Sequence, residues 1–499
     1  MNPDPAEGPI QAAVSERQAA GWDLRNAARN YSTLVAAQVA VAAFSFASVW
    51  LITRNLGTDG YGGVVAIIAA SQIAQIFVNW TGVSLTRYGV EEFVESGKIS
   101  NSFWARSAIF LPNTFILLLC GPLWLPIVSG WLKLPANAIW FVAAHFAVSA
   151  VWLHIQQAMQ AAKLPRLQGV MLAAERILIF VGLLCLVAAG RLDGLTAIAA
   201  YIAAPAVMAI AGLIAIRRLF SWRIDIRLDV IAKLLKFSLP LIPYSLIGYF
   251  STNYLDAIFI SQYLTRADLG VYSVAYQING ILLQFPLLAG TLLLPLFITL
   301  RSTGKADRVT TYMEDLLPIL TLAGGVAALL AALAATFLIP LVFGEQAVGS
   351  VNIFWILISS AVLTIPTIVG FAPFTNAVSA TYVASALALV SSVANLAGNY
   401  FLIPRYGLKG CAWATVLAYG ASVLVAVVIV RTRFSIRHTW ILPACLPVLT
   451  ASAYASATGD LVLAFAIGIV MTAAVLIIWQ RALARGVRML KDYRAFVGG

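Results

Sequence analysis

The sequence predicts an all-α polytopic membrane protein with about fourteen transmembrane helices. Its composition is the first observation: 61% of the 499 residues are hydrophobic and 10% are charged, and the mean hydropathy is +0.90. The second is that apolar runs of about 20 residues, the length that crosses a bilayer, recur along the whole chain. The third is that only short connections separate them, so no stretch is long enough for a separate soluble domain.

The predicted spans follow the apolar runs in order. They are 31–52, 62–82, 103–126, 137–160, 169–190, 195–216, 237–262, 269–297, 316–338, 351–372, 381–402, 411–430, 440–457 and 461–480. The four cysteines, Cys120, Cys185, Cys411 and Cys445, fall in or at the ends of these runs. Their spacing indicates neither a metal site nor a disulfide framework, so we interpret them as packing residues.

The cationic residues predict the topology. Loops on the side of the N-terminus are rich in Lys and Arg, whereas the opposite loops hold only Arg54, Lys133, Arg191, Arg266, Arg405 and Lys409. Cationic loops resist translocation, so we expect both termini in the cytoplasm and an even number of spans. The formal charge of +12 therefore reflects topology and gives no reason to expect a nucleic-acid partner. The polar segment 1–30 lacks the apolar core of a signal peptide.

The chain divides at its longest basic connection, residues 217–236. We expect an N-lobe at 31–216, a C-lobe at 237–430, two further spans at 431–480 and a basic cytoplasmic tail at 481–499. The lobes echo each other weakly, because Thr53, Arg54, Asp59, Gly60 and Tyr61 after the first span resemble Thr265, Arg266, Asp268, Gly270 and Tyr272 after the seventh. Transporters are often built from such halves, with the substrate between them.

Polar residues inside the spans recur at helical spacing. The stripes include Gln72, Gln75 and Asn79 in the second span, Gln277 and Gln284 in the eighth, and Asn395 and Asn399 in the eleventh. Each stripe must face protein or water. One alternative is a set of interhelical hydrogen bonds without a functional role, each worth about 0.6 kcal/mol. The other, favoured by the number of stripes across both halves, is a hydrated central cavity.

Charged residues near the membrane interior are the sharper signal, because each costs at least ~2.5 kcal/mol to insert. Asp256 lies well inside the seventh span, one turn after Asn253. It is either a buried structural acid or an ion-coupling residue. The cationic candidates for ligand contact are Arg54, Arg87, Lys163 and Arg176, and for each arginine snorkelling to the headgroups is the alternative.

The residues do not indicate an enzyme. No loop carries paired carboxylates, a glycine-rich phosphate loop or a Ser/His/Asp arrangement. His145 and His154 lie on different faces of the fourth span, so we expect no metal site. A membrane-embedded glycan polymerase or ligase stays the remote alternative, but it would normally need a larger outer loop for its acid or base.

Three segments resemble the polysaccharide (O-antigen and exopolysaccharide) flippases of the multidrug/oligosaccharidyl-lipid/polysaccharide exporter superfamily. They are 53–87, with Arg-x-Leu-Gly and Tyr-Gly; 233–278, with Phe-Ser-Leu-Pro, an Asp in the helix and Gly-x-Tyr-Ser; and 395–415, NLAGNYFLIPRYGLKGCAWAT. Gly398 departs from the Leu that is usual there, and Cys411 replaces a small Ala.

The resemblance implies two six-helix lobes in a V, as in MATE transporters, plus two extra C-terminal helices. It also implies alternating access that moves a polyprenyl-diphosphate-linked oligosaccharide to the outer leaflet of the bacterial inner membrane, for lipopolysaccharide or exopolysaccharide synthesis. Cavity arginines would bind the diphosphate, polar residues such as Gln72, Asn79, Gln277 and Asn395 would host the glycan, and spans thirteen and fourteen would form a groove for the tail.

Other partners implied by the resemblance are membrane lipids, a polysaccharide polymerase and export machinery. No cofactor is expected, and coupling to H⁺ or Na⁺ through Asp256 and Asn253 stays open. Two transporter alternatives also stay open. A lipid II flippase is disfavoured because 31–52 contains no arginine, and a cation-coupled exporter is disfavoured by the two extra spans.

Overall fold

The computed structural model describes the backbone of residues 7–222, 224–239, 242, 253–380, 382–437 and 440–491. Within these ranges it also describes the side chains, except those of 7–32, 253–254, 291–292, 295 and 486–491. Residues 240–241 and 243–252 of the predicted seventh span therefore lie outside the described residues, as do the side chains of the predicted N-terminal segment 1–30. The described ranges contain helices and no strand.

The helices follow the apolar runs closely. The first half contains α1 (Glu7–Asn79), α2 (Gly82–Ser96), α3 (Ser100–Leu119), α4 (Gly121–Trp131), α5 (Ala138–Ala161), α6 (Pro165–Ala188), α7 (Gly194–Ile216) and α8 (Leu228–Ser238). The second half contains α10 (Asn253–Tyr263), α11 (Arg266–Ser302), α12 (Ala306–Thr311), η2 (Tyr312–Leu316), α13 (Leu317–Phe343), η3 (Glu345–Ala347), α14 (Gly349–Pro366), η4 (Thr367–Phe371), α15 (Ala372–Ala377), α16 (Tyr382–Phe434), α17 (Ile441–Thr458), α18 (Leu461–Ile478) and α19 (Gln480–Lys491).

Ten helices in the described part are long and apolar enough to cross a bilayer. Two of these, in α1 and α16, each join two predicted spans through a kink at a glycine with positive φ, Gly57 (φ 71°) and Gly407 (φ 58°). A side chain with a Cβ is strained in that region, which is why glycine occupies both kinks. The protein is therefore a multi-pass membrane protein, while the number of fourteen spans and the domain boundaries stay predictions.

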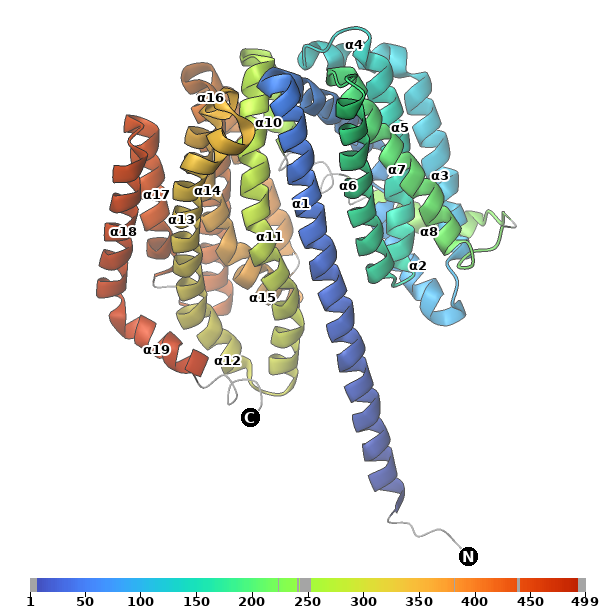
Figure 1. Ribbon diagram of the computed structural model, residues 1–499. Coiled ribbons are helices and arrows are strands. Elements are labelled where there is room, and N and C mark those ends of the chain that lie inside the picture. The colour runs from blue at the N-terminus through green and yellow to red at the C-terminus, as the bar shows by residue number, and fades with distance from the viewer. Residues whose placement is uncertain are drawn as a thin grey trace, which may run out of the picture.

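Two bundles flank the long helix α1. Figure 1 shows α2 to α8 on one side of it and α10 to α19 on the other, with the start of α1 and the end of α19 on the same side of the molecule. Both bundles pack through small and branched side chains. Ala66, Ala69 and Ala70 of α1 and Ala328, Ala332 and Ala335 of α13 are buried in one continuous apolar core.

The halves meet closely at the end away from the termini, which we call the distal seal. A Cβ added to Gly62 would lie 2.0 Å from the carbonyl oxygen of Arg266, and one added to Gly270 would lie 1.9 Å from that of Thr58. The two echoing segments thus pack on each other reciprocally, and glycine is required because backbone approaches backbone. Nearby, Lys133 Nζ donates to the carbonyl oxygens of Gln262 (3.1 Å) and Leu264 (3.2 Å).

Candidate functional site

A cavity of about 530 Å³ lies among α1, α5, α6, α7 and α11. Most of its wall belongs to the first half, and α11 brings Gln277 from the second half. The polar lining residues are Ser45, Ser48, Tyr61, Gln72, Gln75, His145, Ser149, Trp152, Gln156, Glu175, Arg176, Tyr201 and Gln277. Hydroxyl, amide and aromatic groups of this kind bind a sugar by hydrogen bonds and stacking, while one cation and one acid supply the charge.

Arg176 is the cation of this cavity. It lies in α6 next to Glu175, and both side chains line the cavity. Glu175 is buried, and its Oε2 accepts a hydrogen bond from Trp152 Nε1 at 2.9 Å. No salt bridge within 4.0 Å involves Arg176 in the described part of the chain. Arg176 thus lines the polar space without a carboxylate partner among the described residues, and an anionic group of a ligand there can bind its guanidinium.

A second polar layer, around Arg106, lies behind the cavity wall. Gln75 donates to the carbonyl oxygen of Phe146 (3.1 Å) and accepts from the Asn79 amide. Asn79 Oδ1 in turn accepts from Arg106 (3.5 Å). The Arg106 side chain is fully buried, contacts His154 Nδ1, donates to Thr81 Oγ1 (3.4 Å) and lies over the Phe110 ring.

Arg106 is the residue that the sequence analysis missed. It has no carboxylate within salt-bridge distance among the described residues. The available signal was its position inside the predicted third span, where any charge is costly. Its neutral partners also explain why Asn79 is turned away from the cavity, so the polar stripe of the second span divides between the cavity and this layer.

A separate cluster surrounds Asp256 in the second half. The carboxylate is 2% exposed and accepts hydrogen bonds from Tyr272 (2.6 Å), Asn399 (2.7 Å) and Thr415 (3.5 Å). Asn399 also donates to Asn395 Oδ1 at 3.1 Å. These donors come from α11 and α16, and a small cavity of about 10 Å³ adjoins the carboxylate. No cation pairs with Asp256 among the described residues.

The predicted site residues fall in different places. Gln72, Arg176 and Gln277 line the same cavity. Arg54, Arg87 and Lys163 are exposed and do not line it. Arg54 lies near Gly344 at the distal seal, and Arg87 lies 3.9 Å from Glu91 and over the Phe237 ring.

The remaining candidates belong to the second half. Asn395 belongs to the Asp256 cluster, and the side chain of Asn253 lies outside the described residues. No group of three or more His, Cys, Asp or Glu residues in the described part could hold a metal ion.

Residues 27–301 match the model of a family described as polysaccharide biosynthesis protein. The chain belongs to this family. The match covers the first bundle and α11, and so includes every residue that lines the cavity. No curated protein sequence matches the chain.

Solved structures of membrane transporters share the fold. The lipid II flippase MurJ in an inward closed conformation superposes with a TM-score of 0.67 at 13% identity, over 90% of this chain and 99% of that one. The MATE multidrug transporter DinF-BH gives 0.52 at 14% identity, over 82% and 96%. A mutant of the Vibrio cholerae MATE transporter VcmN gives 0.52 at 14% identity, over 81% and 98%. At these identities the likeness establishes the fold alone, which this chain shares with the MurJ and MATE structures.

Proposed function

We propose that this family member is a flippase that moves a polyprenyl-diphosphate-linked oligosaccharide across the bacterial inner membrane by alternating access. The observation that carries the proposal is the polar cavity around Arg176. Its glutamine, serine and aromatic residues suit a glycan, and Arg176, the one arginine among the described lining residues, suits the diphosphate. The proposed substrate serves O-antigen or exopolysaccharide synthesis, and a polysaccharide polymerase and export machinery are its proposed functional partners.

The arrangement of the halves supports alternating access. The cavity lies between α1 and α11, and these two helices also form the distal seal through Gly62 and Gly270. If both termini are cytoplasmic, as the Lys and Arg distribution predicts, the seal closes the outer side. Parting it while the opposite ends approach would turn the same polar wall toward the outer leaflet.

We propose that Asp256 couples transport to a cation, H⁺ or Na⁺. Neutral donors from Tyr272, Asn399 and Thr415 hold its carboxylate, and the buried Asn399 Oδ1 has no hydrogen-bond partner in the part of the chain that the structure describes. The adjoining cavity of about 10 Å³ is close to the space that one water molecule needs. Carboxylate, amide and hydroxyl oxygens at one point are ligands for a hard cation. Asn253, one turn before Asp256, stays a candidate for the same role.

Reconstituted vesicles test the substrate. Wild-type protein should flip a defined polyprenyl-diphosphate oligosaccharide. Arg176→Gln should slow flipping by about tenfold or more, and Arg176→Lys should restore part of the rate through charge. Arg191→Gln, on an exposed loop outside the cavity, is the matched control. Equal flipping by wild type and Arg176→Gln would contradict the proposed role, and transport of lipid II or small cations alone would favour the alternative transporters.

An imposed gradient tests the coupling. Asp256→Asn keeps the shape of the side chain and removes its charge. The variant should bind substrate normally and should no longer respond to a proton or sodium gradient. Full gradient dependence in the Asn variant would make Asp256 structural.

A further inference from the structure

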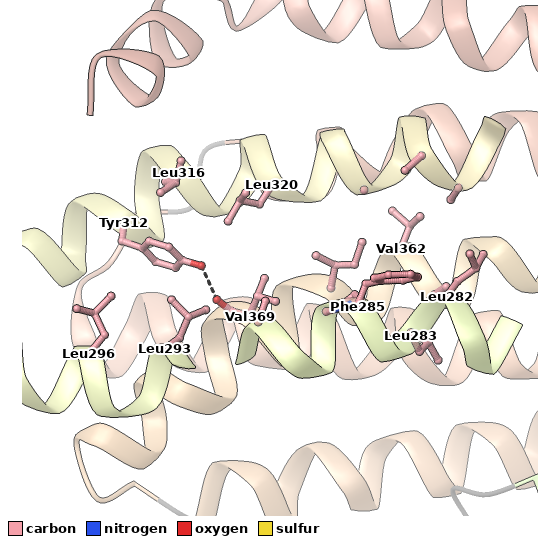
Figure 2. Close-up of a pocket in the computed structure, with 17 residues that line it drawn as sticks. Leu282, Leu283, Phe285, Leu293, Leu296, Tyr312, Leu316, Leu320, Val362 and Val369 are labelled. Carbon is pink, nitrogen blue, oxygen red and sulfur yellow. Dashed lines mark hydrogen bonds between the residues drawn. The ribbon is translucent and has the colours of Figure 1, made fainter. Parts of the chain in front are cut away.

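An apolar groove of about 660 Å³ lies between α11 and α13, away from the polar cavity. Both helices pack on α14, but they make few contacts with each other among the described residues. In Figure 2, Leu282, Leu283, Phe285, Leu293 and Leu296 line one wall, Tyr312, Leu316 and Leu320 the other, and Val362 and Val369 the floor. The groove is thus the space left between α11 and α13, because both helices pack on α14 rather than on each other.

The chemistry of the lining suits a hydrocarbon chain. Tyr312 carries the one side-chain hydroxyl among the described lining residues, and it donates to the carbonyl oxygen of Val369 at 2.7 Å (Figure 2). No polar group of the lining side chains therefore awaits a ligand. From Leu282 to Leu296 the groove extends about 21 Å along α11, enough for the ~15 Å that an acyl chain of one leaflet occupies.

Helix α11 separates the groove from the cavity. Gln277 lines the cavity, whereas Pro286 lines the groove. At about 100° per residue, Pro286 lies half a turn around the helix from Gln277. A molecule in the groove consequently reaches it from the bilayer, which favours a membrane phospholipid over the tail of a substrate whose head lies in the cavity.

One end of the groove lies beside a basic corner. Arg301 is in the last turn of α11 and Lys305 follows it, and no salt bridge within 4.0 Å involves either residue in the described ranges. The neighbouring acids are mostly engaged, because Glu314 accepts from the Arg437 N–H (2.6 Å) and Asp315 binds Arg485 of α19 (3.0 Å). Asp307 is the exposed acid of this corner.

The helix α19 indicates that this basic corner lies at the depth of the lipid headgroups. Its whole sequence, QRALARGVRMLK, is basic and amphipathic, and Figure 1 shows it lying across the ends of the second bundle rather than parallel to the spans. Amphipathic helices of this composition lie in the membrane interface and attract anionic lipids. Through Arg485 and Asp315 it is attached to η2, which forms one wall of the groove.

We propose that this groove binds an anionic phospholipid, with one acyl chain between α11 and α13 and the phosphate at Arg301 and Lys305. The lipid acts as a wedge that fills the gap between the two helices. Spans thirteen and fourteen, where the family resemblance placed a groove for a lipid tail, contribute no residue to it.

Native mass spectrometry of the purified full chain tests the site, with phosphatidylglycerol and phosphatidylcholine of identical acyl chains as probes. The wild type should retain phosphatidylglycerol in preference. Ala289→Phe and Ala327→Phe fill the groove from exposed small residues, and each should lower retention about tenfold, the effect of excluding roughly two methylene groups. Ala473→Phe, on the exposed face of α18, should retain phosphatidylglycerol like the wild type.

The combined change Arg301→Gln and Lys305→Gln should lower phosphatidylglycerol to the level of phosphatidylcholine. Unchanged retention in both groove variants would overturn the site, and equal retention of the two lipids by the wild type would overturn the role of the basic corner. Displacement of phosphatidylglycerol by equimolar polyprenyl phosphate would overturn the phospholipid assignment in favour of a substrate tail. Unaltered elution of each variant in size-exclusion chromatography verifies its folding.

Discussion

Substituting alanine at the distal seal should open it. A Cβ at position 62 would lie 2.0 Å from the Arg266 carbonyl oxygen, and a Cβ at position 270 would lie 1.9 Å from that of Thr58. Both obstacles are backbone atoms, so no side-chain rotation relieves the clash. To restore an ordinary contact, α1 and α11 must separate by about 1.5 Å, and such overpacking costs about 1–3 kcal/mol.

The cost falls on the closed seal alone, because the contact is absent once the halves part. A shift of about 2 kcal/mol would change the ratio of closed to open molecules by roughly 30-fold. Gly62→Ala and Gly270→Ala should therefore both favour the distally open state. Alanine is also a better helix former than glycine by ~1 kcal/mol. A shift of these variants toward the open state would therefore occur even though each substitution stabilises the helix that carries it.

Two other glycines provide controls. A Cβ at Gly63 or at Gly280 would meet nothing within 4 Å. Gly63→Ala changes the adjacent residue in α1, and Gly280→Ala changes the same helix as Gly270. Neither substitution should move the seal, although both introduce the same methyl group into the same helices.

Pulsed electron spin resonance measures the opening. Spin labels at Asn137 and Tyr263, which are exposed on opposite halves near the seal, should report longer distances in Gly62→Ala and Gly270→Ala than in the wild type. Cys120 and Cys185 are first changed to Ser. A wild-type distance distribution in both alanine variants would refute the steric reasoning.

Three further substitutions test packing and capping. Asp193 caps α7 through the Thr196 and Leu195 N–H groups, which lower the pKa of its carboxyl. Asp193→Ala should cost about 1 kcal/mol of stability at neutral pH. Because the ionised carboxylate is the stabilising form, the difference from wild type should begin to shrink as the pH falls below about 3.9 and should vanish below the lowered pKa of the folded protein, as thermal unfolding against pH would reveal. Arg106→Ala should lower the free energy of unfolding by about 3 kcal/mol, because it removes the donor shared by Asn79, Thr81 and His154 and leaves a void; a melting temperature equal to that of wild type would contradict this. Gly398→Leu should destabilise the second bundle although Leu is usual in the resembling family, because a Cβ there would lie 2.7 Å from that of Ala414, and an unfolding temperature at or above that of wild type would show that α16 adapts.

Hydropathy predicted the helices well because each span is long and apolar on its own, so its existence depends little on its neighbours. The sequence separates the spans on either side of Gly57 and of Gly407, whereas the structure joins each pair in one helix with a kink at the glycine. The helical stripes placed Gln72 and Gln277 on polar faces, and the structure brings both to the cavity with Arg176.

The cationic candidates were harder to place. Arg54, Arg87 and Lys163 lie at span ends, where the direction of a long side chain depends on which helix packs beside it. Arg87 lies over Phe237 of α8, a contact that spacing along α2 does not predict. The apolar groove was equally hidden, because hydropathy identifies apolar helices but not the pair that fails to pack.

Helix α11 connects two features that were described separately. Gly270 packs against Thr58 at the distal seal, and two residues later Tyr272 donates to Asp256. The rise between these residues is about 3 Å. A proton or cation that changes the hydrogen bond between Asp256 and Tyr272 would act on the same helical turn that packs at the distal seal. The proposed cation site and the distal seal are therefore coupled directly through α11, without intervening side chains.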